Sequence, residues 1–224
     1  MAFDSEHRLV LGVVFGKRSA TRILALLKGV KQQLQNRVPS LITSDEFSSY
    51  ATVLPRVWPA APVCRRDKRS PRGSHCVQSA AVPDPALNYA TVCKVRRNRR
   101  VIRVRRRAVF GSRDSVAAAL RQSSVSRSIN TSLLERHNAT DRHHNARKQR
   151  RTYRFSKDWL IHQAVGYFTY YSYNFCWCIR TLRQTPQQPG ATSIPRTAAM
   201  AAGLADHPWS LSEWLAHPVA GLAI

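Results

Sequence analysis

The fold class is decided by the stretch at residues 8–54, which reads RLVLGVVFGKRSATRILALLKGVKQQLQNRVPSLITSDEFSSYATVL. Residues 8–15 are a β-branched, apolar run that is typical of a buried strand. A helix capped by Ser19 or Thr21 is predicted next, because apolar residues recur at helical spacing: Ile23, Leu26, Leu27, Val30 and Leu34. Pro39 ends it, and a short strand at residues 40–43 and a short helix with Tyr50, Val53 and Leu54 follow. This strand–helix–strand order predicts an α/β unit with a parallel pair of strands.

A basic loop and a β-hairpin are predicted beyond this unit. Between residues 55 and 85, prolines, arginines and small residues dominate and no hydrophobic period survives, which is typical of a loop. Residues 89–95 (YATVCKV) and 101–110 (VIRVRRRAVF) then read as two strands around a turn at residues 97–99. Arginines occupy at least one face of this hairpin. Ser112 can cap a following helix that contains Val116, Ala119 and Leu120.

The C-terminal half is expected to be mainly helical. One helix begins near Asn130 or Thr131, and little of it can be core because apolar residues are almost absent after Leu134. A longer helix over residues 157–183 has an apolar and aromatic stripe that we expect to face a core: Leu160, Ala164, Tyr167, Phe168, Tyr171, Phe175, Ile179 and Leu182. A linker begins after Gln184, and Ser210 with Glu213 forms a capping box for a last short helix.

The charge balance favours a polyanionic partner. The 224 residues include 36 Lys and Arg against 12 Asp and Glu, a net charge of +24. Neutralising phosphates with such side chains releases condensed counterions, so nucleic acid is the favoured partner. The cluster at residues 96–107 (RRNRRVIRVRRR) has two further interpretations, a localisation signal or a merely solvated face. An apolar fraction of 43% argues against wholesale disorder.

The cysteines, the N-terminal sequence and the polar residues within the longest apolar segment indicate a cytoplasmic protein. Five cysteines, an odd number without a regular spacing, favour a reducing compartment. The N-terminal sequence MAFDSEHRLVLGVV has acidic residues where a signal peptide needs basic ones. Residues 160–179 include His162, Gln163 and Asn174, so they are a poor membrane span, and no membrane association is expected.

Two acidic residues stand out by position. Asp45 follows a buried strand, where α/β sheets place ligands, although such an Asp is often only a turn or cap residue. Glu135 lies one turn into a basic helix, where an acid often serves only the helix dipole. Asn138 and Arg142 share its face, and a basic run follows: Arg147, Lys148, Arg150 and Arg151. This pattern suits a carboxylate that holds a divalent metal beside a DNA backbone.

A family resemblance joins these features. Residues 135–158, ERHNATDRHHNARKQRRTYRFSKD, resemble the signature of the transposases of the insertion-sequence-one type. The strand, helix and strand before Asp45 resemble the segment that leads to the second catalytic Asp of these enzymes. Residues 196–214, RTAAMAAGLADHPWSLSEW, resemble the C-terminal signature of related bacterial transposases. Together the matches cover most of the chain outside residues 55–85.

The resemblance implies an RNase H-like α/β fold, a mixed sheet flanked by helices, with a DDE triad that binds two Mg²⁺ or Mn²⁺ ions for DNA cleavage and strand transfer. Asp45 corresponds to the second Asp and Glu135 to the Glu, with 135 − 45 − 1 = 89 residues between them. This spacing is longer than in the shorter members of the family, and the extra residues contain the basic loop and the hairpin as an insertion. The first strand and first Asp are expected to be missing, with Asp4 in the turn between the second and third strands. The chain alone is therefore expected to be inactive.

The expected organisation and partners follow from this resemblance. Residues 1–54 and 112–183 form the catalytic core, 55–111 the insertion, and 184–224 a linker and tail. The partner is DNA, both transposon ends and target, and a homo-oligomer is plausible by resemblance. Asn138 and Arg142 support the site or touch DNA, and the remaining candidate DNA contacts are Arg147, Lys148, Arg150, Arg151, Lys157, Arg103, Arg105 and Arg107.

Several alternatives stay open. His137, His143 and His144 could suggest zinc, but adjacent histidines point apart and no CxxC pair exists, so structural or DNA-contacting roles are favoured. The aromatic stripe at residues 159–177 is interpreted as core in preference to a base-stacking surface. Two other functions compete with a transposase fragment: a non-catalytic DNA-binding remnant, and a basic structural protein that binds RNA.

Overall fold

A computed structural model describes residues 1–60, 81–149, 151, 153–185 and 192–217. The chain divides into two compact units. The central unit comprises Val14–Ser132, and the terminal unit combines Met1–Val13 with Leu133–Ile224. The fold is mixed α/β, and each unit is described by itself.

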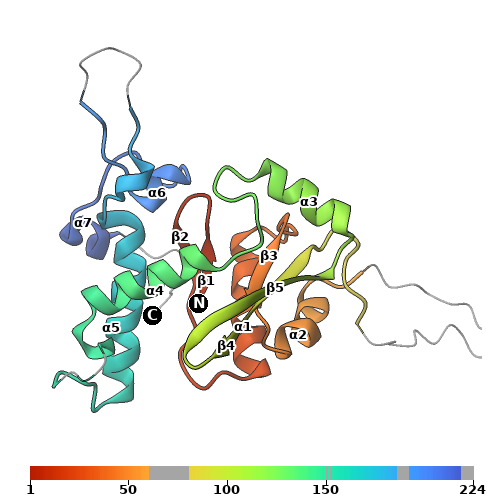
Figure 1. Ribbon diagram of the computed structural model, residues 1–224. Coiled ribbons are helices and arrows are strands. Elements are labelled where there is room, and N and C mark those ends of the chain that lie inside the picture. Colours follow the sequence, from red (N-terminus) through yellow and green to blue (C-terminus); the bar gives the residue numbers. More distant parts are fainter. Residues whose placement is uncertain (61–80, 150, 152, 186–191, 218–224) are drawn as a thin grey trace, which may run out of the picture. The chain divides into compact units, whose positions relative to one another are not determined.

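The central unit contains a three-stranded mixed sheet in the order β3-β4-β5 (Figure 1). Strand β3 (Ile42–Asp45) runs parallel to β4 (Tyr89–Arg97), which pairs antiparallel with β5 (Arg100–Phe110). Its helices are α1 (Ala20–Gln33), α2 (Ser49–Val57) and α3 (Arg113–Gln122). The hairpin expected as an insertion therefore supplies two of the three strands of this sheet.

The predicted apolar stripe of α1 is confirmed. Ile23, Leu26, Leu27 and Val30 are all buried, and α1 packs on α2. The expected cap at Ser19 is also confirmed, because its side chain accepts a hydrogen bond from the Arg22 N–H. The core continues through Val53 and Leu54 of α2 to Tyr89 and Ala90 of β4.

The basic loop begins later than its composition predicts. Pro55 lies inside α2, which continues to Val57. An antiparallel bridge between Pro59 and Pro83 then closes the base of the loop, with Ala60 N–H donating to the Val82 carbonyl at 2.8 Å. Residues 61–80, most of the expected loop, lie outside the described residues.

The terminal unit is built around one long helix, α5 (Trp159–Cys176). Strands β1 (Ala2–Asp4) and β2 (Leu9–Gly12) form an antiparallel hairpin, and β2 packs on α5. Asp4, which was expected in a turn, is the last residue of β1, and its side chain accepts from the Glu6 N–H of the following turn at 2.9 Å. The other helical segments are α4 (Ser132–His144), η1 (Ala146–Lys148), η2 (Arg180–Leu182), α6 (Ala198–Ala201) and α7 (Leu211–Ala216), whose predicted Ser210–Glu213 capping box is present.

The expected parallel pairing of residues 8–15 with residues 40–43 is wrong. Strand β2 pairs with β1, and β3 pairs with β4. A buried amide in α5 explains part of this difference: Asn174 accepts from the Val10 N–H at 2.9 Å and donates to the Val10 carbonyl at 3.0 Å. The side chain thus satisfies backbone groups that a neighbouring strand would otherwise pair.

The core stripe expected along residues 157–183 is wrong in its residues, because four of its eight members are half-buried, four are exposed and none is buried. Buried positions of α5 lie at Gly166, Tyr170, Ser172 and Asn174, whereas Leu160 is 73% exposed. The 18 residues of α5 extend about 27 Å at 1.5 Å per residue, but the four residues of β2 span only about 13 Å. The short strands can cover only part of the helix, so the large side chains of its first turn, Trp159, Leu160 and Ile161, stay exposed.

Candidate nucleic-acid interface

The most basic surface of the central unit is the hairpin of β4 and β5. Residues 93–107, which we call the basic ribbon, contain nine Lys or Arg and no acid. Asn98 and Arg99 form its two-residue turn with φ of 48° and 64°, the conformation that suits the twist of paired strands. Because β5 is an edge strand of the sheet, its outer side is open among the described residues.

Strand geometry places the candidate arginines together. Arg103, Arg105 and Arg107 alternate along β5, so all three lie on one face, about 7 Å apart in succession. They are exposed, and they oppose Val95, Cys93 and Thr91 of β4. This confirms that one face of the hairpin is lined with arginine.

The other face of the ribbon is attached to the fold. Arg106 opposes the buried Val92, and its Nε–H donates to the Ile129 carbonyl at 2.9 Å. Val104 opposes Lys94 on the same face. Of the arginines between residues 103 and 107, Arg106 therefore anchors the strand, and the other three face outward.

Asp45 lies at the carboxyl end of β3, as its last residue. Its carboxylate forms an ion pair with Arg18, whose guanidinium also lies 4.3 Å from the centre of the Phe47 ring. The hydrogen bond to Asp45 raises the pKa of Arg18, and burial raises the pKa of the nearby Tyr50. Asp45 is thus at the predicted edge of the sheet, but it already has a cationic partner.

Glu135 lies in the first turn of α4, on the exposed side of the helix. Arg142 on the same face is also exposed, and Asn138 is half-buried. Arg147, Arg151 and Lys157 are exposed, whereas Arg150 lies outside the described residues. The prediction that this face of the helix is not core is therefore confirmed.

These carboxylates do not constitute a metal centre by themselves. Asp45 belongs to the central unit and Glu135 to the terminal unit. Within the described part of the chain, no group of three or more His, Cys, Asp and Glu side chains could hold a metal ion. Asp45 and Glu135 are two of the three carboxylates that the resemblance implies for the paired ions.

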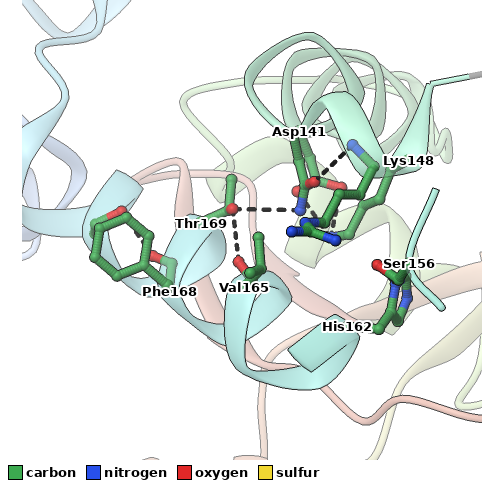
Figure 2. Close-up of polar contacts among 10 residues, drawn as sticks. Asp141, Lys148, Ser156, His162, Val165, Phe168 and Thr169 are labelled. Atoms are coloured by element: carbon green, nitrogen blue, oxygen red, sulfur yellow. Dashed lines mark hydrogen bonds and ion pairs between the residues drawn. The ribbon is translucent and has the colours of Figure 1, made fainter. Parts of the chain in front are cut away.

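The opposite face of α4 carries a buried polar cluster that sequence reasoning missed. Asp141 is 5% exposed, and both its oxygens accept from Lys148 Nζ at 3.0 Å (Figure 2). The ammonium also lies 3.9 Å from the centre of the Tyr170 ring. Burial lowers the pKa of Lys148, and the Asp141 carboxylate raises it in opposition. Lys148, expected among the phosphate contacts, therefore has a structural role, because its ammonium is engaged inside the unit.

His137 occupies the same buried face, one turn before Asp141. It is 4% exposed and lies against three aromatic rings: Phe3 at 4.9 Å, Tyr173 at 4.5 Å and Tyr170 at 5.9 Å between centroids. Burial lowers its pKa to about 4, so the imidazole is neutral at pH 7. These contacts fit the structural role favoured over zinc binding.

The depressed pKa of His137 predicts a loss of stability in mild acid. The protonated imidazole favours the unfolded chain, so the contribution is complete above pH 6.5 and is lost as the pH falls toward 4. Between pH 7 and 4.5 this loss is about 2 kcal/mol. Urea unfolding at both pH values should show a smaller loss for His137→Phe, which keeps a ring in the stack. His143→Phe, at an exposed histidine of α4, should retain the wild-type loss; equal losses in all three proteins would contradict the assignment.

Comparisons of the chain with models of protein families, with curated proteins and with solved structures found no match. Among the helices that the structure describes, none is both long enough and apolar enough to cross a membrane. The residues of the chain itself are therefore the basis for a functional proposal.

Proposed function

We propose that this chain is a DNA-binding protein of the DDE transposase type, with an RNase H-like fold. The mixed sheet, the parallel pairing of β3 with β4 and the place of Asp45 at the carboxyl end of β3 support this proposal. The resemblance of residues 135–158 to the transposase signature supports it independently.

The observation that carries the DNA-binding part is the outward row of Arg103, Arg105 and Arg107 on the basic ribbon. A two-stranded ribbon fits the major groove of B-DNA, which is about 12 Å wide. Guanidinium groups bind phosphate oxygens strongly and with defined geometry. Each phosphate neutralised releases counterions, so binding is expected to weaken steeply as salt rises.

Strand cleavage is a separate part of the proposal. In it, Asp45 and Glu135 are carboxylate ligands for Mg²⁺ or Mn²⁺, and such ions activate an attacking oxygen and stabilise a leaving one. The described residues do not form a complete metal centre. The second candidate, a DNA-binding protein without cleavage activity, is favoured by the ion pair that already engages Asp45.

The proposal is tested by measuring DNA affinity and cleavage on one preparation. Fluorescence anisotropy with a labelled duplex should give a slope of log affinity against log salt of about −4 or steeper, as four or more phosphate contacts require. Affinity that does not change with salt would contradict DNA binding, and equal affinity for folded RNA would favour the RNA-binding alternative.

Cleavage is measured by nicking of supercoiled DNA with Mg²⁺ or Mn²⁺. If the transposase chemistry is retained, nicking should depend on the metal and should be abolished in Asp45→Asn and Glu135→Gln. Salt-dependent DNA binding without metal-dependent nicking would favour the non-catalytic candidate.

A further inference from the structure

The terminal unit contains a cavity of about 220 Å³ that the proposed DNA contacts do not use. The β1–β2 hairpin, α4, the last turn of α5 and the segment after α5 all contribute to its wall. Three aromatic side chains line it, Phe3, Tyr173 and Trp177, together with the cationic side chains Arg8 and Arg136. Flat apolar walls and positive charge therefore meet in one small space.

Polar atoms in the wall of this cavity lack partners. His137 also lines the cavity, and neither of its ring nitrogens has a hydrogen-bond partner among the described residues. One terminal nitrogen of Arg8 is likewise buried and without a partner in the described structure. Buried polar groups are normally hydrogen-bonded, because an unsatisfied one costs free energy. These nitrogens have almost no accessible surface, so they lie behind the cavity surface, and a ligand would be held by the accessible side chains of the wall.

The side chains that line the cavity determine which class of ligand it can bind. A purely apolar molecule would leave Arg8 and Arg136 without a negative partner, and a simple anion would not use the aromatic walls. A cavity of 220 Å³ is smaller than the range of roughly 300–1,000 Å³ typical of drug-sized ligands, so it suits a single ring system.

We propose that this cavity binds one unpaired nucleotide, with its base between the aromatic walls and its phosphate on Arg8 and Arg136. Proteins that hold an extruded base read it by stacking on aromatic side chains and by hydrogen bonds to its edge. The inference rests on the proposed function in taking the nucleotide to be part of a DNA strand. A free nucleotide has the same chemistry, and the experiment separates the two sources.

The probes are two labelled duplexes that differ only in one position, where 2-aminopurine is either paired or left without a partner. The full chain should bind the duplex with the unpaired base more tightly, and its 2-aminopurine fluorescence should fall as the base stacks. Removing one stacking wall should weaken this preference by about 5- to 100-fold, the range expected for loss of one base–aromatic stack.

Matched variants locate the effect. Tyr173→Leu and Trp177→Leu should lose the preference and the fluorescence change, whereas Tyr173→Phe should keep both. Trp177 is 44% exposed, so Trp177→Leu tests the wall with little effect on the core. Tyr153→Leu, at a fully exposed tyrosine outside the cavity, should behave as wild type. Circular dichroism confirms that each variant is folded.

The outcomes separate this inference from the proposed function. Equal affinity for both duplexes, unchanged in Trp177→Leu, would overturn the cavity assignment and leave DNA binding intact. If neither duplex binds, the proposed function fails, and titration with free 2-aminopurine deoxyribonucleoside monophosphate decides whether the cavity takes a free nucleotide. Fluorescence changes with that nucleotide that are lost in Trp177→Leu would retain a nucleotide site, and their absence would overturn it.

Discussion

Replacing Lys148 with methionine should lower the free energy of unfolding by about 3–4 kcal/mol at pH 7, as expected when one partner of a buried ion pair is removed. Asp141 is 5% exposed and would be left without the ammonium that both its oxygens contact. Urea denaturation followed by circular dichroism measures the change.

Two comparisons show whether the lost ion pair causes this effect. Arg147→Met removes a neighbouring but exposed cation and should change stability by less than about 1 kcal/mol. Asp141→Asn combined with Lys148→Met removes both charges and should recover most of the loss, since neutral replacements of buried pairs are often tolerated. A deficit of the same size in the double variant would assign the role of Lys148 to packing alone.

Local patterns in the sequence predicted the central unit well. The four buried residues of α1 follow from helical spacing, and Ser19 follows from its side-chain chemistry as a cap. The hairpin follows from two β-branched runs with a short polar turn between them. These features depend on residues close in the sequence. The pairing of β3 with β4 joins residues 47 apart in the sequence, such as Ile42 and Tyr89, and it was not predicted.

The buried polar face of α4 could not be predicted from hydrophobic periodicity. His137, Asp141 and Asn145 recur every four residues, but all three are polar, so a search for apolar stripes passes over them. Their burial depends on partners elsewhere: Phe3 for His137, Lys148 for Asp141 and Thr169 for Asn145. The sequence did contain one signal for this buried face: uncharged or paired polar residues recur every four positions, whereas the other face of the helix carries exposed charged residues.

The candidate catalytic residues were placed correctly within their own elements. Asp45 ends a parallel strand, and Glu135 lies on the exposed side of its helix. What the sequence did not reveal is the ion pair between Arg18 and Asp45, formed by residues 27 apart in the chain. This ion pair affects metal binding, because the Arg18 guanidinium occupies a carboxylate oxygen of Asp45 that a divalent ion would also need.

Changing Arg103, Arg105 and Arg107 together to glutamine should weaken duplex DNA binding by about 100-fold at 0.15 M salt, since each lost phosphate contact reduces the counterion release that drives binding. The slope of log affinity against log salt should become less steep by about 3, one unit for each contact. The three side chains share one exposed face of β5, so their replacement leaves the anchoring bond of Arg106 in place. Anisotropy titrations at several salt concentrations measure both quantities.

A matched variant separates a local contact from the overall charge of the chain. Lys28, Arg56 and Arg113 are exposed in the same unit but lie outside the ribbon, and changing all three to glutamine also reduces the net charge from +24 to 24 − 3 = +21. If the ribbon binds DNA, this control should weaken binding far less and leave the salt slope nearly unchanged. Equal losses in the two variants would mean that net charge attracts the DNA and that the arginine row has no special part in holding it.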